Sequence, residues 1–188
     1  MSQNANAQQV RTVTTVDRGK LDLKALTLYA ILLAAGFVLN MTVSKFFSGL
    51  TGGILSPEFI IAAFCLETLI IRPKVGQAAV LGLLAGVVIQ ITASVKGPDL
   101  IAEPVAAAVM ALLVSAFADS RAKGLLPLVG TFVVTFISGI IYAVIFSFLI
   151  MKNPAFMGVM APVVAATGVA NAIIVAALHL PIKKALKL

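Results

Sequence analysis

The chain has 188 residues, of which 61% are apolar, and its formal net charge is +7. A soluble domain averages about 45–50% apolar residues, so a water-soluble fold of this length could not bury the excess. We therefore expect an all-α integral membrane protein with a lipid bilayer around most of the chain. The basic residues stand at the ends of apolar runs rather than in one patch, which argues against a nucleic-acid partner.

The clearly polar block of the chain is its first part, residues 1–23, which is rich in Asn, Gln and Thr. This composition predicts a disordered tail in the cytoplasm, followed by one membrane domain over residues 24–188. The tail does not read as a secretory signal, because the first apolar run comes too late and is long enough to span a membrane.

Six apolar runs are candidates for membrane spans, each of which needs about 20 residues. The joints between the runs contain Gly, Pro, Asn and Asp, the residues that turns require. The sequence therefore predicts a bundle of six transmembrane helices, over residues 23–43, 54–71, 75–95, 100–118, 125–150 and 154–180.

The distribution of Lys and Arg predicts the orientation of this bundle, because cytoplasmic loops carry an excess of both. If both termini are cytoplasmic, only three of the 14 Lys and Arg residues fall in outer loops, namely Lys45, Lys96 and Lys152. The other basic residues flank the inner ends of the runs. We therefore expect a multi-pass protein of the cell membrane with its N- and C-termini in the cytoplasm.

Several motifs of enzyme chemistry are missing from the sequence. It has no phosphate-binding G-x-x-x-x-G-K-[ST], no H-E-x-x-H, no G-x-S-x-G and no C-x-x-C. A single histidine and a single cysteine cannot build a common zinc site. We therefore expect no enzymatic activity, no catalytic residue, no metal and no cofactor.

Three acidic residues fall inside the proposed spans, where an ionised group costs at least about 2.5–3.5 kcal/mol. Glu58 and Glu103 lie near the outer ends of their runs, and each is next to a proline. Their matching depth suggests one polar site open to the outside, although each acid could instead cap a helix at the headgroup level. Glu67 lies nearer the cytoplasm, and we expect it to pair with Arg72 or Lys74.

Uncharged polar and aromatic residues gather on the same outer side. Asn171 is deeper, and we expect it to hydrogen-bond between helices. The aromatic residues could form an apolar pocket for a ring or, alternatively, an interfacial belt. The candidate substrate-binding residues are Asn40, Phe46, Phe47, Glu58, Gln90, Glu103, Tyr142, Phe146, Asn153 and Phe156.

Short motifs along the chain resemble a known family. Ala30-Ile31-Leu32-Leu33-Ala34 forms an A-x-x-x-A pair, and the size, the six runs and the missing ATP site agree with it. Together they resemble the substrate-binding S components of energy-coupling factor (ECF) transporters. The tryptophan-type S components are the most similar, through residues 36–39, 46–47, 57–58, 82–86, 90–92 and 104–105.

The resemblance implies a substrate-capture subunit of an ECF-type ABC importer in a prokaryotic plasma membrane. Its substrate would be an amino acid such as tryptophan or a vitamin-like nutrient, bound on the extracellular side beneath a lid at residues 44–53. Ala30 and Ala34 would contact a scaffold transmembrane subunit, and two ATPase subunits would power the cycle. The sequence departs from the family at Ser44-Lys45, where prolines are expected, and at Glu103, where a basic residue is expected.

Two other functions remain open on the sequence alone. A self-contained secondary transporter or channel would move its substrate without partners, but the sequence shows no clear buried ion relay. A structural membrane subunit would bind no ligand at all.

Overall fold

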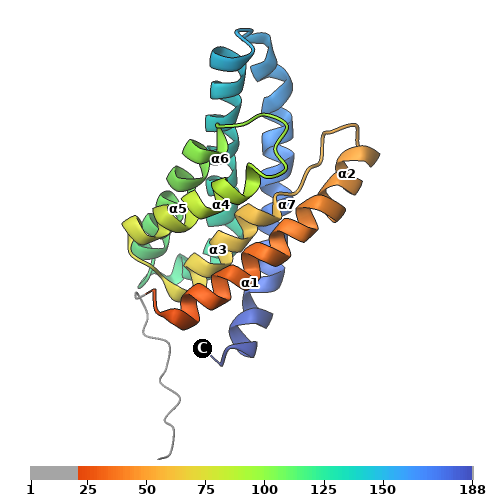
Figure 1. The fold of residues 1–188 in the computed structure, drawn as a ribbon. Coiled ribbons are helices and arrows are strands. Elements are labelled where there is room, and N and C mark those ends of the chain that lie inside the picture. Colours follow the sequence, from red (N-terminus) through yellow and green to blue (C-terminus); the bar gives the residue numbers. More distant parts are fainter. Residues whose placement is uncertain (1–20, 188) are drawn as a thin grey trace, which may run out of the picture.

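The computed structural model describes residues 21–187, and the regular secondary structure within that range is helical (Figure 1). The tail predicted at residues 1–23 lies almost wholly outside the described residues. The elements are α1 (Leu23–Leu39), η1 (Asn40–Ser44), α2 (Lys45–Leu50), α3 (Phe59–Ile71), α4 (Val75–Ile89), α5 (Asp99–Ala116), η2 (Arg121–Leu125), η3 (Leu126–Gly130), α6 (Thr131–Val144), η4 (Ile145–Ile150) and α7 (Ala155–Ala185).

Four helical stretches in the described part of the chain are long and apolar enough to cross a membrane. They are Leu23–Leu50, Asp99–Ala116, Arg121–Ile150 and Ala155–Ala185. Two further apolar helices, α3 and α4, have only 13 and 15 residues. The all-helical fold and the apolar character of its helices agree with a multi-pass membrane protein. The start of α1 and the end of α7 lie at the same end of the bundle (Figure 1).

The helix boundaries differ from the sequence prediction around the first two joints. The expected lid loop at residues 44–53 is helical as far as Leu50, with Gly49 inside the helix, and the chain turns only at the Gly52-Gly53 pair. Both glycines have positive φ, +63° and +89°, a conformation that suits Gly and ends helices. The next helix begins at Phe59 rather than at residue 54, since the proline at position 57 disfavours helical backbone just before it.

The helices at the third and sixth predicted runs also differ in length from the prediction. α4 ends at Ile89 instead of residue 95, and turns occupy most of the segment from there to α5. α7 continues to Ala185, beyond the predicted end at residue 180, although Pro181 lies inside it. Pro181 has no N–H to donate to the turn before it, but the residues after it keep theirs, so the last turn can form past it.

The short helix α3 is the centre of the bundle. Every residue from Ile60 to Ile71 is buried. The helix packs against α1, α4, α5, α6 and α7. A helix that is apolar around its whole circumference is expected to lie inside a larger structure. Other helices therefore surround α3, which forms the core of the bundle with only 13 residues.

Close helix crossings at glycines set the geometry around α3. A Cβ on Gly36 of α1 would lie 2.7 Å from the carbonyl oxygen of Phe59. On α4, a Cβ on Gly86 would lie 2.6 Å from the carbonyl oxygen of Asp99, and one on Gly82 would clash with the carbonyl of Glu103. Small residues at spacing four allow such backbone contact between helices. The glycine pair of α4 therefore fits against two α5 positions that are also four residues apart.

Glu67 lies on α3 and is fully buried. Neither of its carboxylate oxygens has a hydrogen-bond partner among the described residues. The predicted pairing of Glu67 with Arg72 or Lys74 is therefore wrong. The pair does not form because the helix stops before the basic residues. Arg72 is the C-cap of α3 in a left-handed conformation, φ 59°, and Lys74 is the exposed N-cap of α4.

Candidate substrate-binding site

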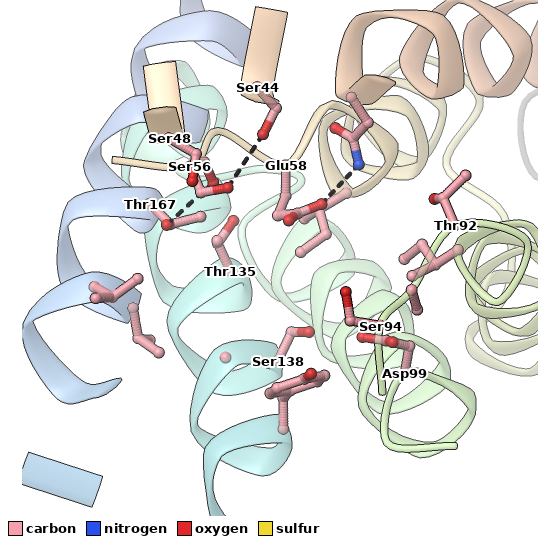
Figure 2. Close-up of a pocket in the computed structure, with 18 of the residues that line it drawn as sticks. Ser44, Ser48, Ser56, Glu58, Thr92, Ser94, Asp99, Thr135, Ser138 and Thr167 are labelled. Carbon is pink, nitrogen blue, oxygen red and sulfur yellow. Dashed lines mark hydrogen bonds between the residues drawn. The ribbon is translucent and has the colours of Figure 1, made fainter. Parts of the chain in front are cut away.

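A cavity of about 600 Å³ lies where the end of α1 meets the starts of α3 and α5, with α6 and α7 on its other side. We call it the polar cavity. Its volume is in the range of sites for small organic ligands. Many hydroxyl groups line it, as Figure 2 shows, and they come from Ser44, Ser48, Ser56, Thr92, Ser94, Thr135, Ser138 and Thr167.

The non-helical segment before α3 forms one wall of the polar cavity. Because α3 begins only at Phe59, its first N–H groups have no partner within the helix. Such groups need partners inside the protein where water is excluded, and irregular backbone is tolerated there when it lines a cavity. Two asparagines from other helices supply these partners.

Asn40 is the first of the two asparagines. Its Oδ1 accepts from the backbone N–H of Phe59 at 2.7 Å, and its Nδ2 donates to Oε2 of Glu58 at 2.8 Å. It lies in the π-helical turn η1, and such turns re-aim side chains and are frequent at functional sites. Asn40 thus holds the start of α3 and the Glu58 carboxylate at once.

Asn171 of α7 is the second. Its Oδ1 accepts from the N–H of Glu58 at 2.8 Å, and its Nδ2 donates to the Glu58 carbonyl at 3.2 Å and to Oγ1 of Thr135 at 3.3 Å. The interhelical hydrogen bonding expected of Asn171 is confirmed. Two further contacts fix the same segment, Ser44 Oγ to Ser56 Oγ and Thr167 Oγ1 to the Ser56 carbonyl, each at 3.2 Å (Figure 2).

The first two turns of α5 carry two buried acids into the polar cavity, Asp99 and Glu103. Oε1 of Glu103 accepts a hydrogen bond from Oγ of Ser138 at 2.8 Å. Oε2 of Glu103 is buried and has no partner among the described residues. Asp99 lies near Gln90, with Nε2 of Gln90 at 3.5 Å from its Oδ2.

The structure brings four of the predicted site residues to the polar cavity: Asn40, Glu58, Glu103 and Tyr142. Gln90 is adjacent but faces the turn after α4, where it accepts from the N–H of Gly97 at 2.8 Å and its carbonyl accepts from Lys96. It therefore shapes the wall around Asp99. Substrate binding by any of these residues stays a prediction.

The remaining predicted residues lie away from the lining. Phe46 and Phe47 are 63% and 38% exposed and pack against each other. Phe146 stacks on the Tyr142 ring at 6.1 Å between centroids, and Phe156 packs edge-on to Phe146 at 5.7 Å. Of the two alternatives for the aromatic residues, an apolar pocket for a ring is not formed at this cavity, since Tyr142 alone among them lines it.

Two sets of predicted residues lie elsewhere on the surface. Asn153 is exposed, and its Oδ1 accepts from the N–H of Ala155, where α7 begins. Ala30 and Ala34 lie four residues apart on the exposed side of α1. Their contact with a scaffold subunit stays a prediction.

Sequence reasoning missed Asp99 and Lys45 as lining residues. Asp99 belongs to a Gly-Pro-Asp turn, and its spacing of four from Glu103 was the available signal that both share one helix face. Lys45 looked like an outer loop residue because the helical continuation of α1 through η1 was not foreseen. The hydroxyl residues carry no sequence pattern of their own.

The polar cavity is acidic, since Glu58, Asp99 and Glu103 line it against the single basic side chain of Lys45. Within residues 21–187, no three His, Cys, Asp or Glu side chains are placed to hold a metal ion together. Comparisons of the chain with models of protein families, with curated proteins and with solved structures found no match. The chemistry of the cavity is therefore the basis for assigning a function.

Proposed function

We propose that the chain captures a small polar nutrient in the polar cavity from outside the cell and hands it to the cell interior. The observation that carries the proposal is the cavity itself, which combines acids, hydroxyls and amides in an otherwise apolar bundle. Polar groups in a membrane domain are costly and usually serve a substrate path. Asn40 and Asn171 pre-organise its wall, which reduces the ordering needed on binding.

The proposal includes six spans with both termini in the cytoplasm. α3 and α4 count as spans in it, with α3 enclosed by the other helices. Three observations support the orientation: the excess of Lys and Arg at the inner ends, the shared end of α1 and α7 in Figure 1, and the cavity near the far end of α1. The cavity then opens toward the outside.

The resemblance of the sequence supports a more specific version, an S component of an ECF-type ABC importer in a prokaryotic plasma membrane. Ala30 and Ala34 on the exposed side of α1 suit a helix of the scaffold subunit, since small residues allow close approach. Two ATPase subunits supply the energy in this version. The resemblance implies an amino acid such as tryptophan or a vitamin-like nutrient as the substrate of this version. Residues 51–58, together with α2, take the place of the lid.

Binding by the purified protein tests this function. The chain in lipid nanodiscs is titrated with amino acids and water-soluble vitamins without ATP, and native mass spectrometry searches for a retained small molecule. We expect one compound to bind with a Kd between about 1 nM and about 1 μM. Glu58→Gln should weaken that binding, and Glu67→Gln, a buried acid away from the cavity, should not. Absence of binding across the whole set contradicts the proposal.

A second candidate is a self-contained, ion-driven transporter. Glu67 favours it, because a buried acid without a partner inside a membrane domain is typical of a proton relay. Vesicles that contain this protein alone distinguish the two functions. Uptake driven by a proton gradient and lost in Glu67→Gln supports the second candidate, whereas binding without flux supports the first.

A further inference from the structure

We propose that the ligand of the polar cavity is a small organic cation, an amine whose ammonium group binds at Glu103. This inference rests on the proposed function and names its substrate class. It differs from a neutral or zwitterionic nutrient such as tryptophan, whose carboxylate would need a basic partner deep in the site. Three features of the cavity carry the argument.

The first feature is the unused hydrogen-bonding capacity of Glu103. This side chain is 2% exposed and lines the cavity. Its Oε1 is taken by Ser138, whereas Oε2 is buried and lacks a partner among the described residues. A buried acceptor without a donor is costly. A ligand ammonium supplies both the donor and the opposite charge, so it fits this position better than any acceptor group does.

The second feature is the imbalance of charge around the cavity. Glu58 is held by Asn40 at 2.8 Å, whereas the amide of Gln90 reaches Asp99 only at 3.5 Å. The lining thus keeps two acids, Asp99 and Glu103, on one face of α5, and Oε2 of Glu103 has no partner among the described residues. The only basic lining residue, Lys45, is exposed. A ligand carboxylate next to the ammonium would face these acids at short range.

The third feature is the neutral part of the wall. Tyr142 lines the cavity, and its ring can receive a cation on its face. The serine and threonine hydroxyls, which Figure 2 shows around the cavity, can donate to or accept from the rest of the ligand. No cluster of rings among the lining residues favours an aromatic side chain over an aliphatic one.

Matched ligand pairs test the inference on the full chain in nanodiscs at pH 7. Tryptamine is compared with tryptophan, and pentylamine with 6-aminohexanoate, because each pair differs by the presence of a carboxylate. Agmatine and putrescine, which also carry N–H donors, extend the set of cations. We expect at least one cation to bind, and to bind about tenfold or more tighter than its carboxylate counterpart where it has one.

Variants identify the group that is responsible. Glu103→Gln keeps the shape and the Ser138 contact but removes the charge, so it should reduce cation binding about tenfold or more and abolish the preference within each pair. Glu67→Gln is the matched control, since it also removes a buried acid but lies outside the lining, and it should leave both unchanged. Gel filtration and circular dichroism check that the variants fold.

The possible outcomes distinguish failure of this inference from failure of the proposed function on which it rests. Equal or tighter binding of tryptophan or 6-aminohexanoate overturns the cation class but leaves nutrient capture intact. An unchanged preference in folded Glu103→Gln overturns the assignment to Glu103. If neither these compounds nor the amino acids and vitamins bind, both the proposed function and the inference fail. The ligand pairs decide the class on the unmodified chain even where Glu103→Gln does not fold.

Discussion

Replacing Asn171 by leucine should destabilise the fold at the point where the α3 helix begins. The amide of Asn171 makes three hydrogen bonds, to the N–H and carbonyl of Glu58 and to Thr135. Interhelical hydrogen bonds in membrane proteins are worth about 0.6 kcal/mol each on average, so three of them give about 2 kcal/mol. Leucine has the same number and branching of side-chain heavy atoms as asparagine, so the lost bonds are the main change in Asn171→Leu. A loss of about 2 kcal/mol lowers the folding equilibrium constant about 30-fold.

Unfolding by sodium dodecyl sulfate in mixed micelles measures this change, with helicity as the readout. Ile173→Ala on the exposed side of the same helix serves as the control, and it should stay within about 0.5 kcal/mol of the parent chain. Binding should also fall in Asn171→Leu, because the Glu58 backbone loses the contacts that set its position in the cavity wall. An unfolding curve for Asn171→Leu that matches the control would show that the α3 start needs no cap from α7.

Three shorter predictions follow. Gly86→Ala should lower the free energy of unfolding by about 1–3 kcal/mol, because its Cβ would meet the α5 backbone. Gly76→Ala, which faces open space, should not destabilise the fold, and the same detergent titration compares the two variants. Glu67→Met should stabilise the fold in that titration, since it removes a buried acid without a partner. Lys45→Cys in a Cys65→Ser background should react with a membrane-impermeant maleimide on intact cells. Reaction only after permeabilisation would show that the proposed orientation of the chain is wrong.

Much of the fold could be predicted because the apolar character of a helix is a property of many residues together, so single exceptions do not hide it. The apolar runs located every long helix, and the starts of α1 and α5 lie within one residue of the expected positions. Helix ends were less predictable. The continuation of α1 through the π-turn η1 into α2 depends on contacts with the 54–58 segment, such as Ser44 to Ser56, which no local pattern announces.

The candidate site was predictable where charge and depth carried the signal. Glu58 and Glu103 stood out because acids inside apolar runs are rare, and both line the polar cavity. The aromatic residues misled for a physical reason: an apolar ring next to a cavity and one facing lipid have the same sequence environment. Phe46 and Phe47 are exposed, since the helix carries them away from the cavity.

Two different backbone features fix the positions of the polar groups and create the space of the cavity. Gly36 crosses α3 one helical turn before Asn40, and the glycine pair of α4 crosses α5 at the carbonyls of the two α5 acids. Backbone contact at these points fixes where the polar groups stand, without side chains that could relax. The break before Phe59 and the turns after Ile89 instead leave space that no helix fills. The close helix crossings and the non-helical segments therefore both border the cavity. The buried acids stand on rigid helices there, next to space that a ligand can occupy.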